Sequence, residues 1–288
     1  MNQTPKPKLQ TLNHILGELT QANDLAFQLQ QGGKSPGPQT GIDSLDEAIG
    51  GFLSPGLHVL QAAPGAGKTA MGLQIASDCG FPCLYVSCEM PAVELFRRLI
   101  ARTTKTFLSK LRPGQLATET LLKLAIRTAE TCNGLAVLDC TKGWASTTTL
   151  HQMASLLCES RNSQNCLIIL DSLQYWARSE DGGAGEYEAI NEGLRGLTEV
   201  AFALSSPLVV ISHRNRQANK AGGGLHGSKG SGLVEYAAET VIDLEREKDM
   251  DARGKFGTTL SIHKNRHGEA GKEISLLFHG ALQNFEER

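Results

Sequence analysis

The chain has 288 residues, of which 40% are hydrophobic, and a formal net charge of −2 at pH 7. This length allows one large α/β domain plus a small appendage, and the nearly neutral charge excludes a global basic field, so any nucleic-acid contact must come from local clusters. The seven scattered cysteines include no C-x-x-C pair, the N-terminus lacks the apolar core of a secretory signal, and no apolar run approaches the roughly 20 residues that cross a bilayer, so we expect a reduced, cytoplasmic protein without a membrane partner.

Residues 1–39 are expected to form a flexible N-terminus that contains an amphipathic linker helix. Apolar residues recur from Leu12 to Leu29 mostly at three- and four-residue steps, which is the pattern of one helix face. A pair of glycines and a proline-containing linker then end the helix. The helix either folds back on its own domain or docks on a neighbouring subunit, and the residues leave both arrangements open.

The stretch 58–76 joins an apolar strand, a glycine-rich loop and an amphipathic helix. This order is typical of a P-loop, in which small residues let backbone N–H groups surround a triphosphate at the N-terminus of a helix. Lys68 is predicted to reach the β- and γ-phosphates and Thr69 to bind Mg²⁺, so ATP and Mg²⁺ are the expected cofactors. The predicted nucleotide-binding residues are Ala63, Pro64, Gly65, Ala66, Gly67, Lys68, Thr69 and Ala70.

Strands and helices alternate through the rest of the chain, which is expected to form one domain over residues 40–288. Strands are predicted at 58–62, 82–87, 135–139, 166–171, 208–212, 240–244, 258–263 and 273–278. Helices are predicted within 40–57 and at 68–79, 92–102, 119–132, 148–161 and 187–204. Most connections are too long for hairpins, so we expect an α/β fold with a mainly parallel central sheet flanked by helices, and with partly antiparallel C-terminal strands.

Three polar side chains follow predicted strands, where the carboxyl ends of parallel strands line a ligand crevice. Asp171 is predicted to hold Mg²⁺, through water. Glu89 is predicted to orient or deprotonate the water that attacks the γ-phosphate. His213 is placed to sense the γ-phosphate and pass its loss to the following loop. The alternative for each is a structural or solvated residue at a strand end.

The loop after His213 is cationic and glycine-rich, and no acidic residue occurs between Glu199 and Glu235. Such a loop suits a phosphate backbone, so single-stranded DNA is the expected partner. The alternative is an ordinary solvated loop. A second glycine-containing loop, at 182–185, is flanked by acidic as well as basic residues, which suits DNA less well. The candidate DNA-binding residues are Arg214, Arg216, Lys220 and Lys229.

Lys264 and Arg266 lie two residues apart at the end of a predicted strand, so both side chains share one face. The P-loop already supplies a lysine, so these cations are predicted to serve the nucleotide of a neighbouring subunit. Such an inserted cation is worth roughly 10³–10⁵ in rate. The alternative is a surface turn.

The sequence also resembles the C-terminal motor domain of DnaB-type replicative helicases, over about residues 40–288. The resemblance rests on the order and spacing of TGIDSLD, AAPGAGKTA, VSCEM, KLRPGQL, LIILDSLQYW, ISHRNR, GSGLVEYAAETVIDL and KNRHGEAG. It implies a RecA-like P-loop NTPase fold and an ATP-hydrolysing homo-oligomer, expected to be a hexameric ring, that moves 5′ to 3′ along single-stranded DNA.

The same resemblance assigns roles to individual residues. Glu89 falls on the catalytic carboxylate, Asp171 on the Walker B aspartate, and Lys264 and Arg266 on the trans-acting finger pair. His213 stands where the bacterial replicative enzymes usually have glutamine. Lys68 and Thr69 fall on the P-loop lysine and hydroxyl positions.

Two other functions remain open at this point. DSLQ together with KNR is also similar to RadA-type recombination ATPases, and a third function is a nucleotide-gated assembly module without DNA translocation. The helicases carry a folded N-terminal collar domain, whereas we expect only a candidate helix before the motor here, so the resemblance does not extend to a replicative role or to a loader or primase partner. In the family, a linker helix in this place packs on the adjacent subunit, which favours the docking arrangement of the N-terminal helix.

Overall fold

The computed structural model describes residues 9–180, 186–214 and 236–288, in two units that divide after Pro36. The first unit contains α1 (Leu12–Gln31), which begins where the side chain of Thr11 accepts a hydrogen bond from the backbone N–H of His14. The predicted amphipathic helix is therefore present. A single helix offers no partner for its own apolar face.

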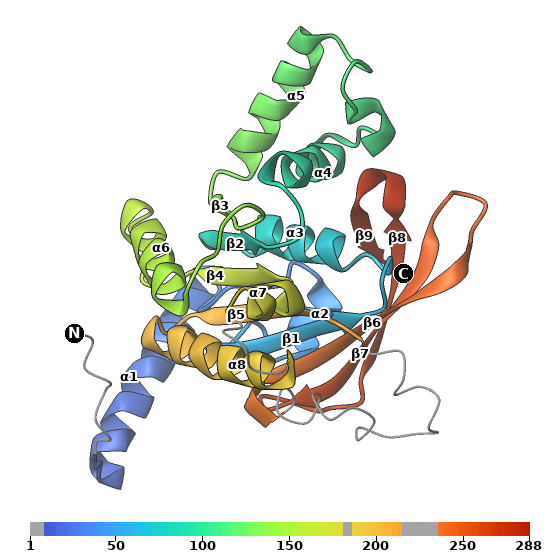
Figure 1. Ribbon diagram of the computed structural model, residues 1–288. Helices are drawn as coiled ribbons and strands as arrows, with labels where there is room; N and C mark the ends of the chain where they lie inside the picture. The colour runs from blue at the N-terminus through green and yellow to red at the C-terminus, as the bar shows by residue number, and fades with distance from the viewer. Residues whose placement is uncertain (1–8, 181–185, 215–235) are drawn as a thin grey trace. The chain divides into compact units, whose positions relative to one another are not determined.

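The second unit is built on a nine-stranded sheet, counted over the described residues, with the order β3-β2-β4-β5-β1-β6-β7-β8-β9 (Figure 1). The strands from β3 to β6 in this order run parallel, and β7, β8 and β9 are antiparallel to their neighbours. The expected α/β fold with antiparallel C-terminal strands is confirmed. The strands are β1 (Gly56–Ala62), β2 (Cys83–Ser87), β3 (Leu135–Asp139), β4 (Leu167–Asp171), β5 (Pro207–His213), β6 (Thr240–Met250), β7 (Phe256–Asn265), β8 (Glu273–His279) and β9 (Asn284–Glu287).

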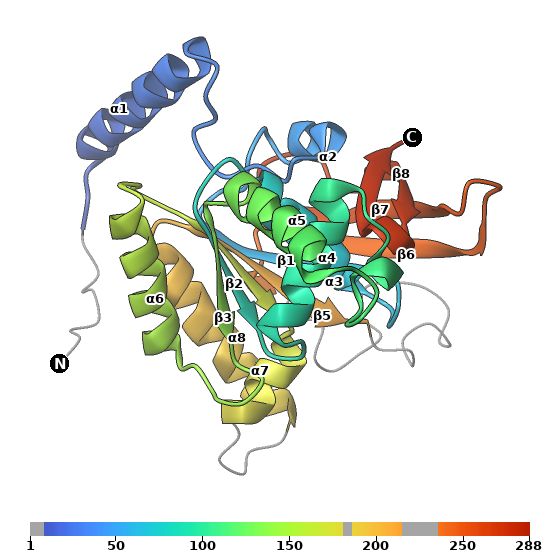
Figure 2. The same cartoon turned by 90° about the horizontal axis from the view of Figure 1, so that it is seen from above.

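Helices cover both faces of the parallel strands. In Figure 2, α3 and α4 lie on one side of the sheet and α6 and α8 on the other. The central strands β2 and β4 are buried on both faces, because each face packs against helices. The helices of this unit are α2 (Asp43–Ala48), α3 (Lys68–Asp78), α4 (Ala92–Thr104), α5 (Thr118–Thr131), α6 (Thr147–Ser160), α7 (Leu173–Glu180) and α8 (Glu186–Ala203), with short 3₁₀ helices η1 (Leu108–Leu111) and η3 (Gly280–Leu282).

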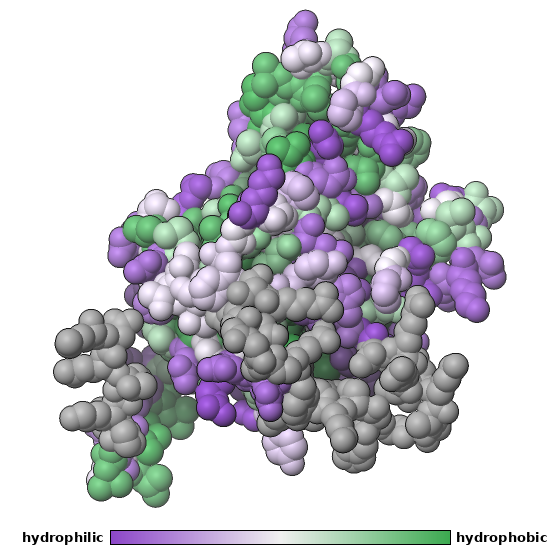
Figure 3. All heavy atoms as spheres, in the orientation of Figure 1, coloured by the Kyte–Doolittle hydropathy of each residue, from purple (hydrophilic) through white to green (hydrophobic). Residues whose placement is uncertain are grey.

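Apolar side chains also remain at the surface near the edge strand β3. Leu122 and Ile126 of α5 are half exposed, and Figure 3 shows apolar surface over this helix. Val93, Phe96 and Val137 line a groove between α4, α5 and β3. Among the described residues, no helix combines the length and the apolar content that a bilayer crossing requires.

The C-terminal strands support the glycine-rich loop that precedes α3. Gly67 has φ +106°, and a Cβ atom there would lie 3.1 Å from Phe285 and 3.2 Å from Phe278. The amide of the buried Gln74 in α3 donates to the backbone carbonyl of Phe285 at 3.1 Å and accepts from its N–H at 2.8 Å. The loop and the first helix after it are therefore fixed by β8 and β9, far along the chain.

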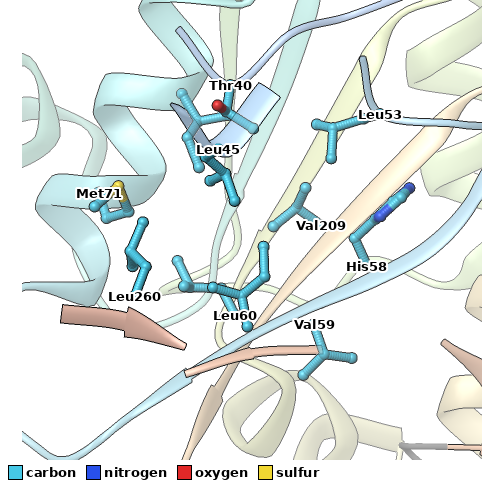
Figure 4. Close-up of a pocket in the computed structure, with 11 residues that line it drawn as sticks. Thr40, Leu45, Leu53, His58, Val59, Leu60, Met71, Val209 and Leu260 are labelled. Carbon is cyan, nitrogen blue, oxygen red and sulfur yellow. The ribbon is translucent and has the colours of Figure 1, made fainter. Parts of the chain in front are cut away.

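A small cavity lies in the core between α3 and the sheet. Figure 4 shows His58 and Leu53 on one side of it, and Met71 and Leu260 on the other. Its lining is almost entirely apolar, and it has room for about one water molecule at most. This cavity belongs to the core packing and is too small for a ligand.

Candidate functional site

The glycine-rich loop joins the carboxyl end of β1 to α3, as its order in the sequence predicts. Gly65 and Gly67 have φ of +78° and +106°, a left-handed conformation that glycine adopts at little cost. The side chain of Lys68 is buried, and its Nζ donates to the carbonyls of Ala62 and Ala63, each at 3.1 Å. Burial lowers the pKa of Lys68, and the nearby negative charges of Asp171 and Glu89 oppose this effect.

Asp171, at the end of β4, accepts two hydrogen bonds on one oxygen atom. The Thr69 hydroxyl and the Tyr85 hydroxyl each donate to its Oδ2 at 2.8 Å. The structure thus brings together the two residues predicted to bind the metal. A hydroxyl and a carboxylate are oxygen ligands that suit Mg²⁺, so the residues present fit this ion.

Sequence reasoning did not find Tyr85. Its hydroxyl lies in a fully buried strand, and burial raises its pKa well above the usual range, with the charge of Asp171 acting in the same direction. It is therefore a neutral donor. A tyrosine inside an otherwise apolar strand was the available signal, because a buried hydroxyl requires a partner.

His213 lies between the glycine-rich loop and Asp171, because β5 lies between β1 and β4 in the sheet. Its Nε2 is 3.8 Å from the Glu89 carboxylate and 3.5 Å from the Ser172 hydroxyl. Its backbone N–H donates to the side chain of Gln174 at 3.2 Å. Burial lowers the pKa of His213, as does the positive charge of Lys68, so the ring is neutral near pH 7.

Lys68, Thr69, Glu89, Asp171 and His213 therefore gather at the carboxyl edge of the parallel strands. The set contains a cation, a hydroxyl, two carboxylates and a neutral imidazole. A triphosphate held by the loop would lie beside the Lys68 ammonium and the Thr69 hydroxyl. A water molecule has room to contact the half-exposed carboxylate of Glu89.

Lys264 and Arg266 lie at the opposite end of the sheet. In the register of β6 and β7, Lys264 pairs with Val241 and Asn265 with Thr240, and Thr240 pairs with His58 near the start of β1. The glycine-rich loop follows the other end of β1. The four residue steps from 58 to 62 alone span about 13 Å, so the two cations are separated from the P-loop of their own chain.

The first candidate DNA-binding residue is engaged in ion pairs. Arg214 contacts the carboxylates of Asp243 and Glu245 in β6, and its backbone N–H donates to the Ala62 carbonyl at 3.0 Å. Burial raises the pKa of Asp243, whereas the charge of Arg214 opposes that shift. Arg216, Lys220, Lys229 and the loop at 182–185 lie outside the described residues.

The chain was compared with known protein families and with individual proteins, and it is similar to several of them. The family model of the DnaB-like helicase C-terminal domain matches residues 37–287. The replicative DNA helicase DnaB of Treponema pallidum (strain Nichols) is 28% identical over 254 residues, which cover 86% of this chain and 56% of that protein. The replicative DNA helicase DnaB of Haemophilus influenzae is 24% identical, over 96% of this chain and 61% of that protein.

A solved structure of an ATPase domain shares the fold. It superposes with a TM-score of 0.81 and 20% identity, over 98% of this chain and all of that domain. The chain thus spans about three fifths of the length of the two helicases above, and matches the full length of this ATPase domain.

Proposed function

The chain belongs to the family of DnaB-like helicase C-terminal domains, and on this premise we propose that it is an ATP-dependent DNA helicase motor that hydrolyses ATP between subunits. The observation that carries the proposal is the separation of the glycine-rich loop and the cations Lys264 and Arg266 to opposite ends of one sheet. A cation pair that far from its own P-loop is suited to a nucleotide held by another copy of the chain.

In this proposal the cleft of one subunit holds ATP. Lys68 contacts the β- and γ-phosphates, and Thr69 and Asp171 hold Mg²⁺. Mg²⁺, when bound, neutralises charge on the phosphates. Glu89 orients or deprotonates the attacking water, and its exposed carboxylate leaves room for that water. The neutral ring of His213, close to both Glu89 and Lys68, senses the γ-phosphate.

The neighbouring subunit completes the cleft with Lys264 and Arg266, and the oligomer is a hexameric ring, as in the family. DNA binds to the segment that follows β5, where Arg216, Lys220 and Lys229 supply positive charge, whereas the charge of Arg214 is already balanced by Asp243 and Glu245. Arg214 links this segment to the P-loop, because its N–H donates to the last carbonyl of β1. The motor moves 5′ to 3′ on single-stranded DNA.

The test is the ATPase rate with and without single-stranded DNA, with the oligomer mass measured in the same buffer and nucleotide. We expect single-stranded DNA to stimulate hydrolysis and a duplex with a 5′ tail to be unwound in preference to one with a 3′ tail. Lys68→Ala should abolish both ATP hydrolysis and duplex unwinding.

A ring that forms, hydrolyses ATP and unwinds neither duplex would refute the helicase function. Strand exchange by the same preparation would indicate a recombination ATPase instead. Negligible DNA affinity at every salt concentration would indicate an assembly module.

A further inference from the structure

Both cations of the proposed finger pair are held by the short segment before β6. The Nζ of Lys264 donates to the Tyr236 carbonyl at 3.1 Å, and Nη2 of Arg266 donates to the same carbonyl at 3.0 Å. Nη1 of Arg266 lies 3.2 Å from Oε1 of Glu239. The backbone N–H of Arg266 also donates to the Glu239 carbonyl at 3.0 Å, so one residue holds both the main chain and the side chain of Arg266.

Glu239 is itself held rigidly. Its side chain is 8% exposed, and its second oxygen, Oε2, lies 3.0 Å from Nε2 of His267. Gly56, at the start of β1, leaves the space that the side chain needs, because a Cβ atom there would lie 2.8 Å from the Glu239 Cγ. Each carboxylate oxygen therefore has a defined partner in a packed site.

A buried carboxylate without a cation is costly, so Glu239 strongly favours Arg266 in this one orientation. The guanidinium is not enclosed by the contact, since half of the Arg266 side chain is exposed. An arginine has five N–H donors, and the contacts described above involve one donor from each of its two terminal nitrogens. Within the part of the chain that the structure describes, the remaining donors have no hydrogen-bond partner and can reach a phosphate. The negative charge of Glu239 also reduces the repulsion between Lys264 and Arg266.

We infer that Glu239 is the positioning residue of the trans-acting Arg266: it fixes the guanidinium before the neighbouring nucleotide arrives. This inference rests on the proposed function, because it assumes that Arg266 acts on the ATP of another copy. Glu239 does not touch that ATP. Its contribution is orientation, and a displacement of about 1 Å at a reacting centre can reduce the rate about 10²-fold.

The first test compares Glu239→Gln with the wild-type chain and with Glu273→Gln, a matched loss of one carboxylate from an exposed position at the start of β8. We expect Glu239→Gln to lower kcat about 100-fold while KM for ATP, oligomer mass and binding of a fluorescent ATP analogue stay as in the wild type. Glu273→Gln should retain the wild-type kcat. A wild-type kcat in Glu239→Gln would overturn the inference.

The second test assigns the defect to one side of the interface. In mixed oligomers, Arg266→Ala should recover activity with Glu89→Gln, because some interfaces combine an intact finger with an intact carboxylate. Glu239→Gln should recover activity with Glu89→Gln in the same way, and none with Arg266→Ala, because those two defects affect the same side. Recovery with Arg266→Ala would refute the positioning role.

These outcomes separate the inference from its premise. If Arg266→Ala and Glu89→Gln form mixed oligomers but give no recovery at any ratio, the shared site fails and the inference fails with it. If that pair recovers and Glu239→Gln behaves as the wild type, only the inference fails. Should Glu239→Gln not fold, Glu239→Asp keeps the charge but shortens the side chain by one methylene, and the same mixing pattern is expected of it.

Discussion

The Asp171 carboxylate accepts hydrogen bonds from Thr69 and Tyr85 on the same oxygen. If the Thr69 hydroxyl turns to a bound Mg²⁺, Tyr85 is the side-chain donor that remains on Asp171 among residues 9–180, 186–214 and 236–288. A residue that orients a metal ligand in this way typically contributes about 10- to 100-fold in metal affinity.

Tyr85→Phe removes this donor and keeps the ring that fills the core. We expect the Mg²⁺ concentration that gives half-maximal binding of a fluorescent ATP analogue to rise about 10-fold, while binding without Mg²⁺ stays unchanged. Tyr236→Phe is the control, since that tyrosine is 80% exposed. An unchanged Mg²⁺ titration in Tyr85→Phe would show that Asp171 keeps its orientation without the Tyr85 hydroxyl.

His58 is a buried neutral histidine whose two ring nitrogens both have partners. Nδ1 lies 2.9 Å from the Thr240 hydroxyl and Nε2 lies 2.7 Å from the Ser54 carbonyl, so the Nε2–H donates and Nδ1 accepts. Burial lowers the pKa of His58 from 6.5 to about 4. Below pH 6.5 the unfolded chain therefore takes up a proton that the folded chain refuses, and stability falls as the pH falls toward about 4.

The contribution of this residue is measurable by urea unfolding at about pH 7 and about pH 4.5. The wild-type protein should lose about 2 kcal/mol more between these pH values than His58→Gln, whose amide can replace both hydrogen bonds but does not titrate. Equal losses in the two proteins would mean that the ring does take up a proton in the folded state.

The residues at strand ends could be predicted from the sequence, whereas their supporting partners could not. Asp171, Glu89 and His213 each follow an apolar run, and a parallel sheet brings such positions to one edge. Tyr85 and Glu239 depend on which strands are neighbours and in which register, and on the rotamers of Asp171 and Arg266. No short stretch of sequence carries this information.

At the scale of elements, α3 and β9 are joined by the reciprocal hydrogen bonds between Gln74 and the backbone of Phe285. Gln74→Leu would leave a buried N–H and a buried carbonyl without partners, which costs about 3 kcal/mol. Urea unfolding should show this loss, and Gln152→Leu, at an exposed position of α6, should change stability by less than about 0.5 kcal/mol. A small loss in Gln74→Leu would mean that water reaches the backbone of β9.

The sequence predicted most helices and strands, including the short α2, β2, β3 and β4, but it missed α7, β9 and the second half of β6. The strand β3 has the predicted bounds, and α4, α5, α6 and α8 differ from them by one or two residues. The four-residue β9 has only two buried residues, and the second half of β6 is charged and exposed, so neither shows the alternation of a strand. The eight-residue α7 directly follows β4 and is too short for a clear helical period.

At the scale of the whole molecule, the P-loop and the finger pair lie at opposite ends of the sheet. In the proposed function a solitary chain therefore has an incomplete site. We expect the ATPase rate per chain to rise with protein concentration in parallel with the oligomer mass, and to fall on dilution toward the rate of Arg266→Ala. A rate per chain that is constant across concentrations at which the mass is that of one chain would contradict the shared site.

Because the P-loop and the two cations lie at opposite ends of the sheet, the number of complete sites depends on whether the oligomer is open or closed. Copies that place the cations of one chain at the P-loop of the next make a heterologous contact. Such a contact either closes into a ring or continues as an open filament. In the proposed function, an open row of such copies ends in one pocket that lacks its neighbour's Lys264 and Arg266, so we expect this pocket to bind ATP but to hydrolyse it slowly. Closure into a ring completes this last pocket. A preparation in which every bound ATP is hydrolysed at the fast rate has therefore formed closed rings.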